Sequence, residues 1–342
     1  QLSLVSVDSL GQLEVFRKPW FQTFTTFLAM SLVLCVERLV KGLAAACRPT
    51  PRVQMVEDAL LEQPGAGAES QRKLFLVAIP AFCDLLATIL AMTGIVYIRA
   101  SVWQMLRGAT LFFTGMFSCL LLKIKLYLFH WLGLLLCIAG VVMVGYASVR
   151  HDGQGDRDPF STAFGVAVTL LGQVFQAAQV TAEEYFVKDL HLPAVSIIGF
   201  QGLWAILMMI LVVFPFLWLL PGEDHGHTED IFNTLALVKN SQAVFCMFMI
   251  RLFACGTFNI MGIAVTGALS AVHRTMLDGL RTMLIWGFGL FVYYAVDPWS
   301  PFSEEWTHSS QLQLCGFVIL IFGQAVYGEL FRLPCLRYPE RL

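Results

Sequence analysis

Apolar residues along this chain form long continuous runs separated by polar stretches. A helix needs about 20 apolar residues to cross the roughly 30 Å hydrocarbon core of a bilayer. Nine runs meet this requirement, and none shows the period-two alternation of a membrane-spanning strand. We therefore predict an all-α polytopic membrane protein. Its nine transmembrane helices are expected at approximately Trp20–Leu39, Phe75–Ile98, Ser101–Leu122, Leu126–Val149, Ala163–Phe186, Ser196–Leu220, Ala243–Thr266, Ala271–Val296 and Gln313–Leu330.

Matching glycines indicate an internal repeat. The glycines of the fourth segment recur in the ninth at one constant offset, as Gly133/Gly316, Gly140/Gly323 and Gly145/Gly328. The stretch Met105-Leu106-Arg107-Gly108 likewise resembles Met276-Leu277-Asp278-Gly279. A shift of five segments reverses each helix in the membrane, which is the signature of an inverted repeat. We predict a bundle of five plus five helices with the first helix missing. Residues 1–160 would form the first repeat and 161–342 the second, with residues 1–12 as the tail of a helix preceding Gln1.

Lysine and arginine residues between the segments are unevenly divided across the membrane. Following the chain through nine spans assigns eleven of them to one side and six to the other. Because positive residues are retained on the cytosolic side, the loop 41–73 and the C-terminus are expected in the cytosol.

Composition narrows the function. Hydrophobic residues make up 57% of the chain and charged residues 13%, about half the charged share of a soluble domain. The net charge of −2 gives no basic excess for nucleic acid. Nine cysteines lack regular spacing, and the His- and acid-containing loop 222–230 is expected to be hydrated rather than to bind metal. Because no catalytic motif is present, we expect no enzyme activity, catalytic residue, cofactor or metal.

Charged side chains inside the apolar runs are candidate solute-binding groups, because an unpaired charge in the bilayer costs several kcal/mol. In the eighth segment, Arg274, Asp278 and Arg281 share one helical stripe. Asp278 can pair with an arginine on either side of it, which leaves a net positive face for a solute. The alternative is a closed cluster that only holds helices together. Gln104 and Arg107 of the third segment are expected near the midplane, although Arg107 could instead bind helix-end carbonyls.

Further polar residues lie on three other segments. The fifth segment carries a stripe of amides that ends in two carboxylates, which lines either a water-filled cavity or another helix's polar groups. The two carboxylates are candidates for a gate or for proton coupling, although acids at a helix end are often simply solvated. The predicted solute-binding residues are Gln104, Arg107, Gln173, Gln176, Asn259, Arg274, Asp278 and Arg281, and the candidate gate or coupling residues are Asp84, Glu183, Glu184 and Arg251.

Three motifs resemble a known family. They are Ser101-x-x-Gln104-Met105-Leu106-Arg107-Gly108 with Phe112-x-Thr114-Gly115-x-Phe117-Ser118, then Glu183-Glu184-x-Phe186-Val187, and Leu269-Ser270-Ala271-x-x-Arg274-x-x-Leu277-Asp278-x-Leu280-Arg281-Thr282. These stretches resemble the drug/metabolite transporter superfamily, and within it solute carrier family 35, subfamily F. The resemblance covers roughly residues 20–332, and this chain departs from the family by lacking the first span and by its long first loop. Nucleotide-sugar carriers and chloroquine-resistance-type transporters are similar in fold.

The resemblance and the charged segments together imply a secondary transporter for a small polar solute, anionic or zwitterionic, that works by alternating access in a lipid bilayer. Coupling to a proton or counter-substrate, a homodimer, and an endomembrane such as Golgi, lysosome or vacuole are expected. One alternative is a nucleotide-sugar antiporter of the secretory pathway. Another is a non-transporting membrane scaffold whose working part is the loop 41–73.

Overall fold

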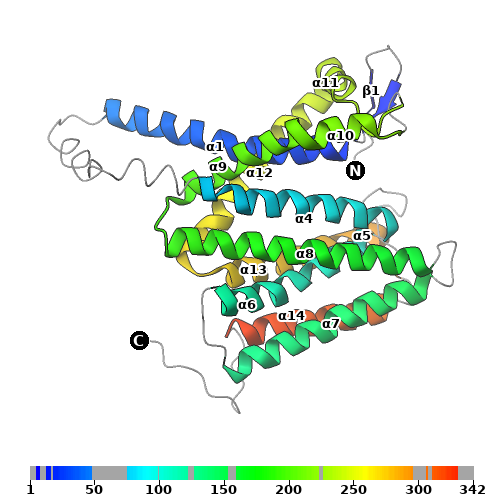
Figure 1. The fold of residues 1–342 in the computed structure, drawn as a ribbon. Helices are drawn as coiled ribbons and strands as arrows, with labels where there is room; N and C mark the ends of the chain where they lie inside the picture. Colours follow the sequence, from blue (N-terminus) through cyan, green and yellow to red (C-terminus); the bar gives the residue numbers. More distant parts are fainter. Residues whose placement is uncertain are drawn as a thin grey trace. The chain divides into compact units, whose positions relative to one another are not determined.

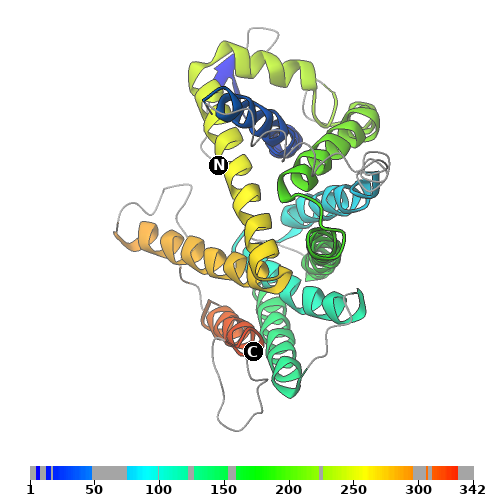
Figure 2. The ribbon, with the colours of Figure 1, turned by 90° about the vertical axis from the view of Figure 1, so that its left-hand side faces the viewer.

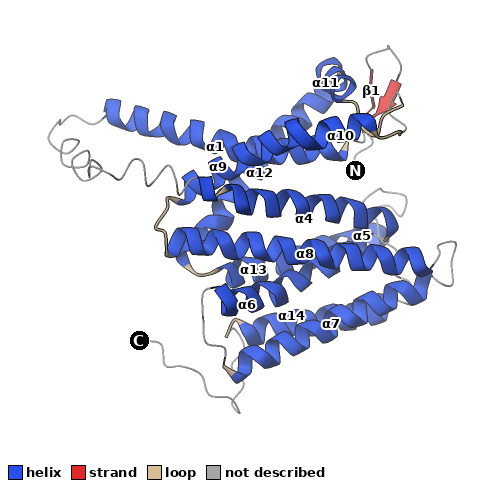
Figure 3. Ribbon diagram, in the orientation of Figure 1, coloured by secondary structure: helices blue, strands red, loops and turns tan. Residues whose placement is uncertain are grey.

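The computed structural model describes residues 5–7, 13–16, 18–47, 75–98, 100–121, 127–152, 159–222, 226–295, 306 and 310–329. Most of the predicted cytosolic loop and C-terminus, and residues 223–225 of the His- and acid-containing loop, lie outside these ranges. The described residues are predominantly helical, as predicted (Figure 3). The sequence reasoning missed one element, an antiparallel hairpin in which β1 (Val5–Val7) pairs with β2 (Leu13–Val15). This hairpin includes part of the segment that was expected to be a helix tail.

Seven helices in the described part of the chain are long and apolar enough to cross a membrane. Two of the nine predicted spans do not meet this test. The third is interrupted by a 3-10 turn, and the eighth is an unbroken helix of 25 residues that carries Arg274, Asp278 and Arg281. The multi-pass architecture is therefore established, while the exact count of nine spans in an inverted repeat stays a prediction.

The chain forms two compact units, each built from separate stretches of sequence. One unit comprises 83–185 and 265–342 with residues 1–2, and the other comprises 3–82 and 186–264. Neither coincides with a predicted repeat, because each takes segments from both halves of the chain. The first unit holds most of α4 (Ala78–Tyr97), α5 (Ala100–Leu106), η1 (Arg107–Ala109), α6 (Thr110–Leu121), α7 (Leu128–Asp152), most of α8 (Pro159–Lys188), α13 (Ala271–Ala295) and α14 (Ser310–Tyr327). The second holds β1, β2, α1 (Pro19–Cys47), α9 (Ala194–Met208), η2 (Met209–Val213), α10 (Phe214–Leu219), α11 (Ile231–Asn240) and most of α12 (Gln242–Ala268).

In the first unit, α7 and α14 lie side by side (Figures 1 and 2). A Cβ placed on Gly140 would lie 2.5 Å from the carbonyl oxygen of Gly316, and one on Gly133 would lie 2.8 Å from that of Gly323. The two backbones therefore touch, which only glycine permits. Exchanging the glycines that the predicted repeat makes equivalent turns one of these contacts into the other. The contact is symmetric under this exchange, while the inverted repeat itself stays a prediction.

In the second unit, α9 packs closely against α1. Gly202 of α9 lies against the backbone of α1, where an added Cβ would lie 2.7 Å from the carbonyl oxygen of Phe27. The helix continues from α9 through the π-helical turn η2 into α10. Pro215 is the second residue of α10 and lacks the N–H that would bind the carbonyl group four positions earlier. A wider π turn accommodates the missing bond within a continuous span.

Candidate functional site

The break in the third predicted span positions Arg107. Val102, Met105 and Leu106 of α5 are completely buried in an apolar cluster of the first unit, which fixes the end of this helix. The chain then tightens into η1, whose carbonyl groups receive side-chain donors. Gln324 Nε2 donates to the carbonyl oxygen of Gly108 at 3.4 Å. An interrupted helix at membrane depth is tolerated where such donors replace the missing backbone bonds, and it often marks a binding site.

Arg107 itself is half-buried. Its guanidinium carbon lies 5.2 Å from the centroid of the Trp103 ring, which is a cation–π contact one helical turn away. Arg107 also interacts electrostatically with Asp278 and Arg281 of α13. The structure therefore brings the third and eighth predicted segments together. Gln104 lies half-buried on the same helix as Trp103.

Gln173 of α8 supports the same turn. The Thr110 hydroxyl lies 2.6 Å from Gln173 Oε1 and 2.7 Å from the carbonyl oxygen of Arg107. Its single proton can serve only one of these acceptors at a time. Thr110 was not among the predicted residues, although its position three residues after Arg107 places it on the next turn. Trp103 was also missed, because an aromatic residue in an apolar run gives no signal of its own.

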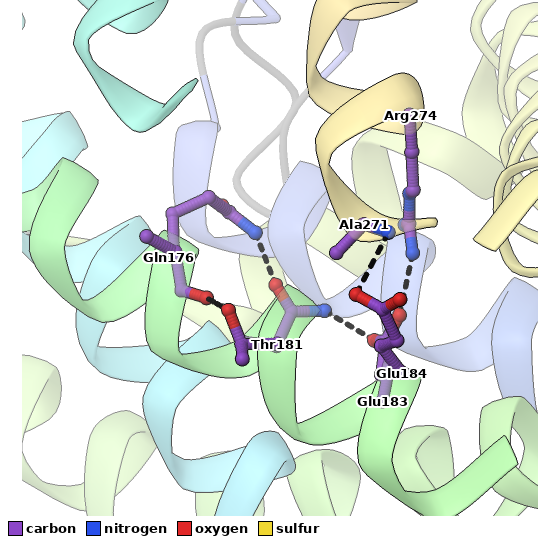
Figure 4. Close-up of polar contacts among 8 residues, drawn as sticks. Gln176, Thr181, Glu183, Glu184, Ala271 and Arg274 are labelled. Atoms are coloured by element: carbon purple, nitrogen blue, oxygen red, sulfur yellow. Dashed lines mark hydrogen bonds and ion pairs between the residues drawn. The ribbon is translucent and has the colours of Figure 1, made fainter. Parts of the chain in front are cut away.

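Further along α8, the predicted amide stripe forms a connected chain (Figure 4). Gln176 Nε2 donates to Gln179 Oε1, and Gln179 Nε2 donates to Glu183 Oε1 at 2.5 Å. The other oxygen of Glu183 accepts from Arg274 Nη1 at 2.5 Å. Gln179, Glu183 and Arg274 are all buried. The chain therefore joins the middle of α8 to the first turns of α13.

Glu184 contacts the same end of α13. Its Oε2 accepts the backbone N–H of Ala271, the first residue of that helix, at 3.0 Å (Figure 4). A carboxylate at a helix N-terminus satisfies an unpaired donor and is favoured by the helix dipole. The adjacent carboxylates of Glu183 and Glu184 thus hold the start of α13 through one side chain and one backbone group. Both are candidate gate residues, and both are buried rather than solvated.

The arginines of this site differ in how they are paired. Asp278 pairs with Arg281 at 3.4 Å, three residues along the same helix, and both side chains are 36% exposed. Arg274 is bound by Glu183 instead, and it also interacts electrostatically with Asp278 and Asp84. Sequence reasoning assigned the arginines to one segment and Glu183 to another, so it missed this pair. Arg274 and Arg281 are thus each paired with a carboxylate, and Arg107 interacts electrostatically with Asp278. A net positive face for a solute stays a prediction.

Arg251 and Asn259 belong to the second unit. Arg251 Nη2 donates to the carbonyl oxygen of Gln22 at 3.2 Å and to Thr26 Oγ1 at 3.4 Å, so it ties α12 to α1. Asn259 Nδ2 donates to the carbonyl oxygen of Cys255 at 2.9 Å within its own helix. That these residues take part in the solute site or its gate stays a prediction.

Comparison with known proteins agrees with these features. The family model described as nucleotide-sugar transporter matches residues 18–214. A Pongo abelii protein named solute carrier family 35 member F6 is 31% identical over 323 residues, which cover 93% of this chain and 80% of that protein. The Homo sapiens protein of the same name is 33% identical over 259 residues, which cover 74% of this chain and 66% of that protein.

These relatives are solute carriers, and the chain is a multi-pass membrane transporter rather than an enzyme. It belongs to the nucleotide-sugar transporter family and, among the solute carriers, to family 35, subfamily F.

Proposed function

We propose that this transporter is a secondary carrier that moves a small polar solute by alternating access, and that Arg107 binds an anionic group of this solute. The observation that carries the proposal is the environment of Arg107. It lies in an interrupted span, it is half-buried, and no carboxylate among the described residues lies within salt-bridge distance of it. A charge held this way at membrane depth is best satisfied by a ligand or water.

The proposed cycle follows from the predicted repeats. The two inverted halves rock about a site near the midplane and expose it to each side in turn. Because Arg274 and Arg281 are already paired with carboxylates, a zwitterionic solute fits this site better than a strongly anionic one. We further propose an endomembrane location with the C-terminus in the cytosol, and coupling to a proton or counter-substrate.

A nucleotide-sugar antiporter is the second candidate, and the family-model match over residues 18–214 favours it. Such a carrier exchanges its solute for a nucleoside monophosphate. Proteoliposomes preloaded with UMP or GMP should then accelerate uptake of a labelled nucleotide sugar several-fold over empty ones. Equal uptake into both would argue against this alternative.

The main proposal is tested with the full-length protein in proteoliposomes. Solutes that raise its melting temperature are identified first, because a ligand of the folded state stabilises it, and their labelled forms are then tested for uptake. We expect Arg107→Ala to abolish uptake and Arg107→Lys to retain part of it, since lysine keeps the charge but not the planar guanidinium. Arg38→Ala, which removes an exposed arginine of α1, is the matched control and should transport normally. Undiminished uptake by Arg107→Ala would overturn the proposal.

A further inference from the structure

The two side-chain hydrogen bonds that link Gln176, Gln179 and Glu183 on α8 run in one direction, toward Glu183. Glu183 accepts on both carboxylate oxygens, one from Arg274 and the other from Gln179. Gln179 must therefore present its NH2 group to Glu183, which leaves its carbonyl oxygen to accept. Gln176 must in turn present its NH2 group to Gln179. The buried ion pair thus determines which group of each of the two amides donates and which accepts.

This direction determines what the free end of the chain offers. One N–H of Gln176 is engaged by Gln179, and no hydrogen bond to the carbonyl oxygen of Gln176 exists among the described residues. Gln176 is partly exposed, whereas Gln179 and Glu183 are only 2% exposed. The carbonyl oxygen of Gln176 is therefore an available hydrogen-bond acceptor at the accessible end of this row of side chains.

We infer that the carbonyl oxygen of Gln176 binds an ammonium or amine group of the transported solute, so that the solute class is a small zwitterion. This inference rests on the proposed function, in which Arg107 binds the anionic group. Gln173 connects the two positions, because it lies one helical turn before Gln176 and also contacts Thr110 beside Arg107. Gln173, which reaches the backbone of the Arg107 turn through Thr110, and Gln176 are about 5 Å apart along α8. A dicarboxylate would instead place an acceptor against the oxygen of Gln176.

The first experiment tests the direction of the chain without any solute. Gln176→Lys places a donor-only group against the oxygen of Gln179, whereas Gln176→Glu places an acceptor there. We expect the purified full-length lysine variant to melt at a higher temperature than the glutamate variant. Both substitutions are repeated in a Gln179→Leu background. There the row of hydrogen bonds is interrupted, and the difference in melting temperature should disappear. A more stable glutamate variant, or a difference that survives in the Gln179→Leu background, would overturn the assigned direction.

The second experiment tests the solute class with three four-carbon probes, namely γ-aminobutyrate, succinate and putrescine. We expect γ-aminobutyrate to raise the melting temperature of the wild-type protein most. Gln176→Leu should weaken its apparent affinity about tenfold, as expected for one hydrogen bond to a charged group, and leave that of succinate unchanged. Preferential stabilisation by succinate or by putrescine, stabilisation by none of the three, or an equal loss of both carboxylate probes in Gln176→Leu would overturn the inference.

The two proposals fail in different ways. If uptake depends on Arg107 but succinate is the preferred probe, the carrier stands and the zwitterion assignment is wrong. If the melting order of the Gln176 variants is as expected and Arg107→Ala transports normally, the chain direction stands and the proposed function is wrong.

Discussion

Removal of either member of the Glu183–Arg274 pair is expected to destabilise the first unit strongly. The two side chains are 3% and 10% exposed, and their charged atoms are 2.5 Å apart. Glu183→Ala leaves a buried guanidinium without this carboxylate, and Arg274→Ala leaves a buried carboxylate whose remaining hydrogen-bond partner among the described residues is Gln179. Breaking a buried ion pair from one side costs about 3–5 kcal/mol. Each single variant should therefore lose about that much free energy of unfolding.

The double variant separates this cost from ordinary side-chain truncation. It leaves neither charge behind, so its loss should fall short of the sum of the single losses by about 2–3 kcal/mol. The assay is equilibrium unfolding of the full-length protein in mixed micelles titrated with a denaturing detergent. Additive losses in the double variant would refute the reasoning, because the pair would then contribute no more than its two side chains separately.

Asp278 and Arg281 provide the matched control within the same helix. Their side chains are each 36% exposed and their charged atoms are 3.4 Å apart. Exposed pairs of this spacing contribute about 0.2–1 kcal/mol. The same cycle of alanine variants should therefore give a coupling energy well below that of the buried pair. Equal coupling energies at the two pairs would show that burial is not the deciding factor.

Three further predictions concern single side chains. Thr110→Val should reduce uptake and should lower the free energy of unfolding by about 1 kcal/mol, because it removes the hydroxyl beside Arg107. Thr114 carries a buried hydroxyl with no partner among the described residues, so Thr114→Val should leave the melting temperature unchanged or raise it. Gly140→Ala should lower the free energy of unfolding by about 1–3 kcal/mol, because its Cβ would lie 2.5 Å from the carbonyl oxygen of Gly316. Gly287 has open space around it, so the melting temperature of Gly287→Ala should be unchanged or slightly higher. Glu229→Gln should cost about 1 kcal/mol of detergent-unfolding free energy, because that carboxylate accepts the first backbone N–H groups of α1 at 2.7 and 3.0 Å; an unchanged midpoint would argue against it.

Helix positions were predictable because a bilayer imposes a minimum apolar length that a sequence either meets or does not. The interruption at η1 was not, since Arg107 and Gly108 are compatible with a regular helix and the break depends on Leu320 and Gln324, which are distant in sequence. The hairpin was also missed. Three-residue strands are too short for an alternating pattern to be distinguished from chance.

For the candidate site, sequence periodicity correctly placed Gln176, Glu183 and Glu184 on one polar stripe of α8. It could not identify the partner of that stripe, because periodicity defines a face of a helix and not the helix that packs against it. The pairing of Glu183 with Arg274 therefore appeared only in the structure. That pairing favours the zwitterionic of the two solute classes expected from the sequence, since an arginine counted as available is already paired.

The contact between α7 and α14 has a mechanical consequence for the first unit. Because Gly133, Gly140, Gly316 and Gly323 leave no layer of side chains between the two backbones, neither helix can slide past the other without a collision of main-chain atoms. The two helices therefore behave as one rigid body, and any bending within the unit must occur elsewhere. If the unit bends in the proposed transport cycle, we expect the bend at Arg107–Ala109, where the regular hydrogen-bond ladder is already interrupted. A solute held by Arg107 would then act directly on the part of the unit that moves.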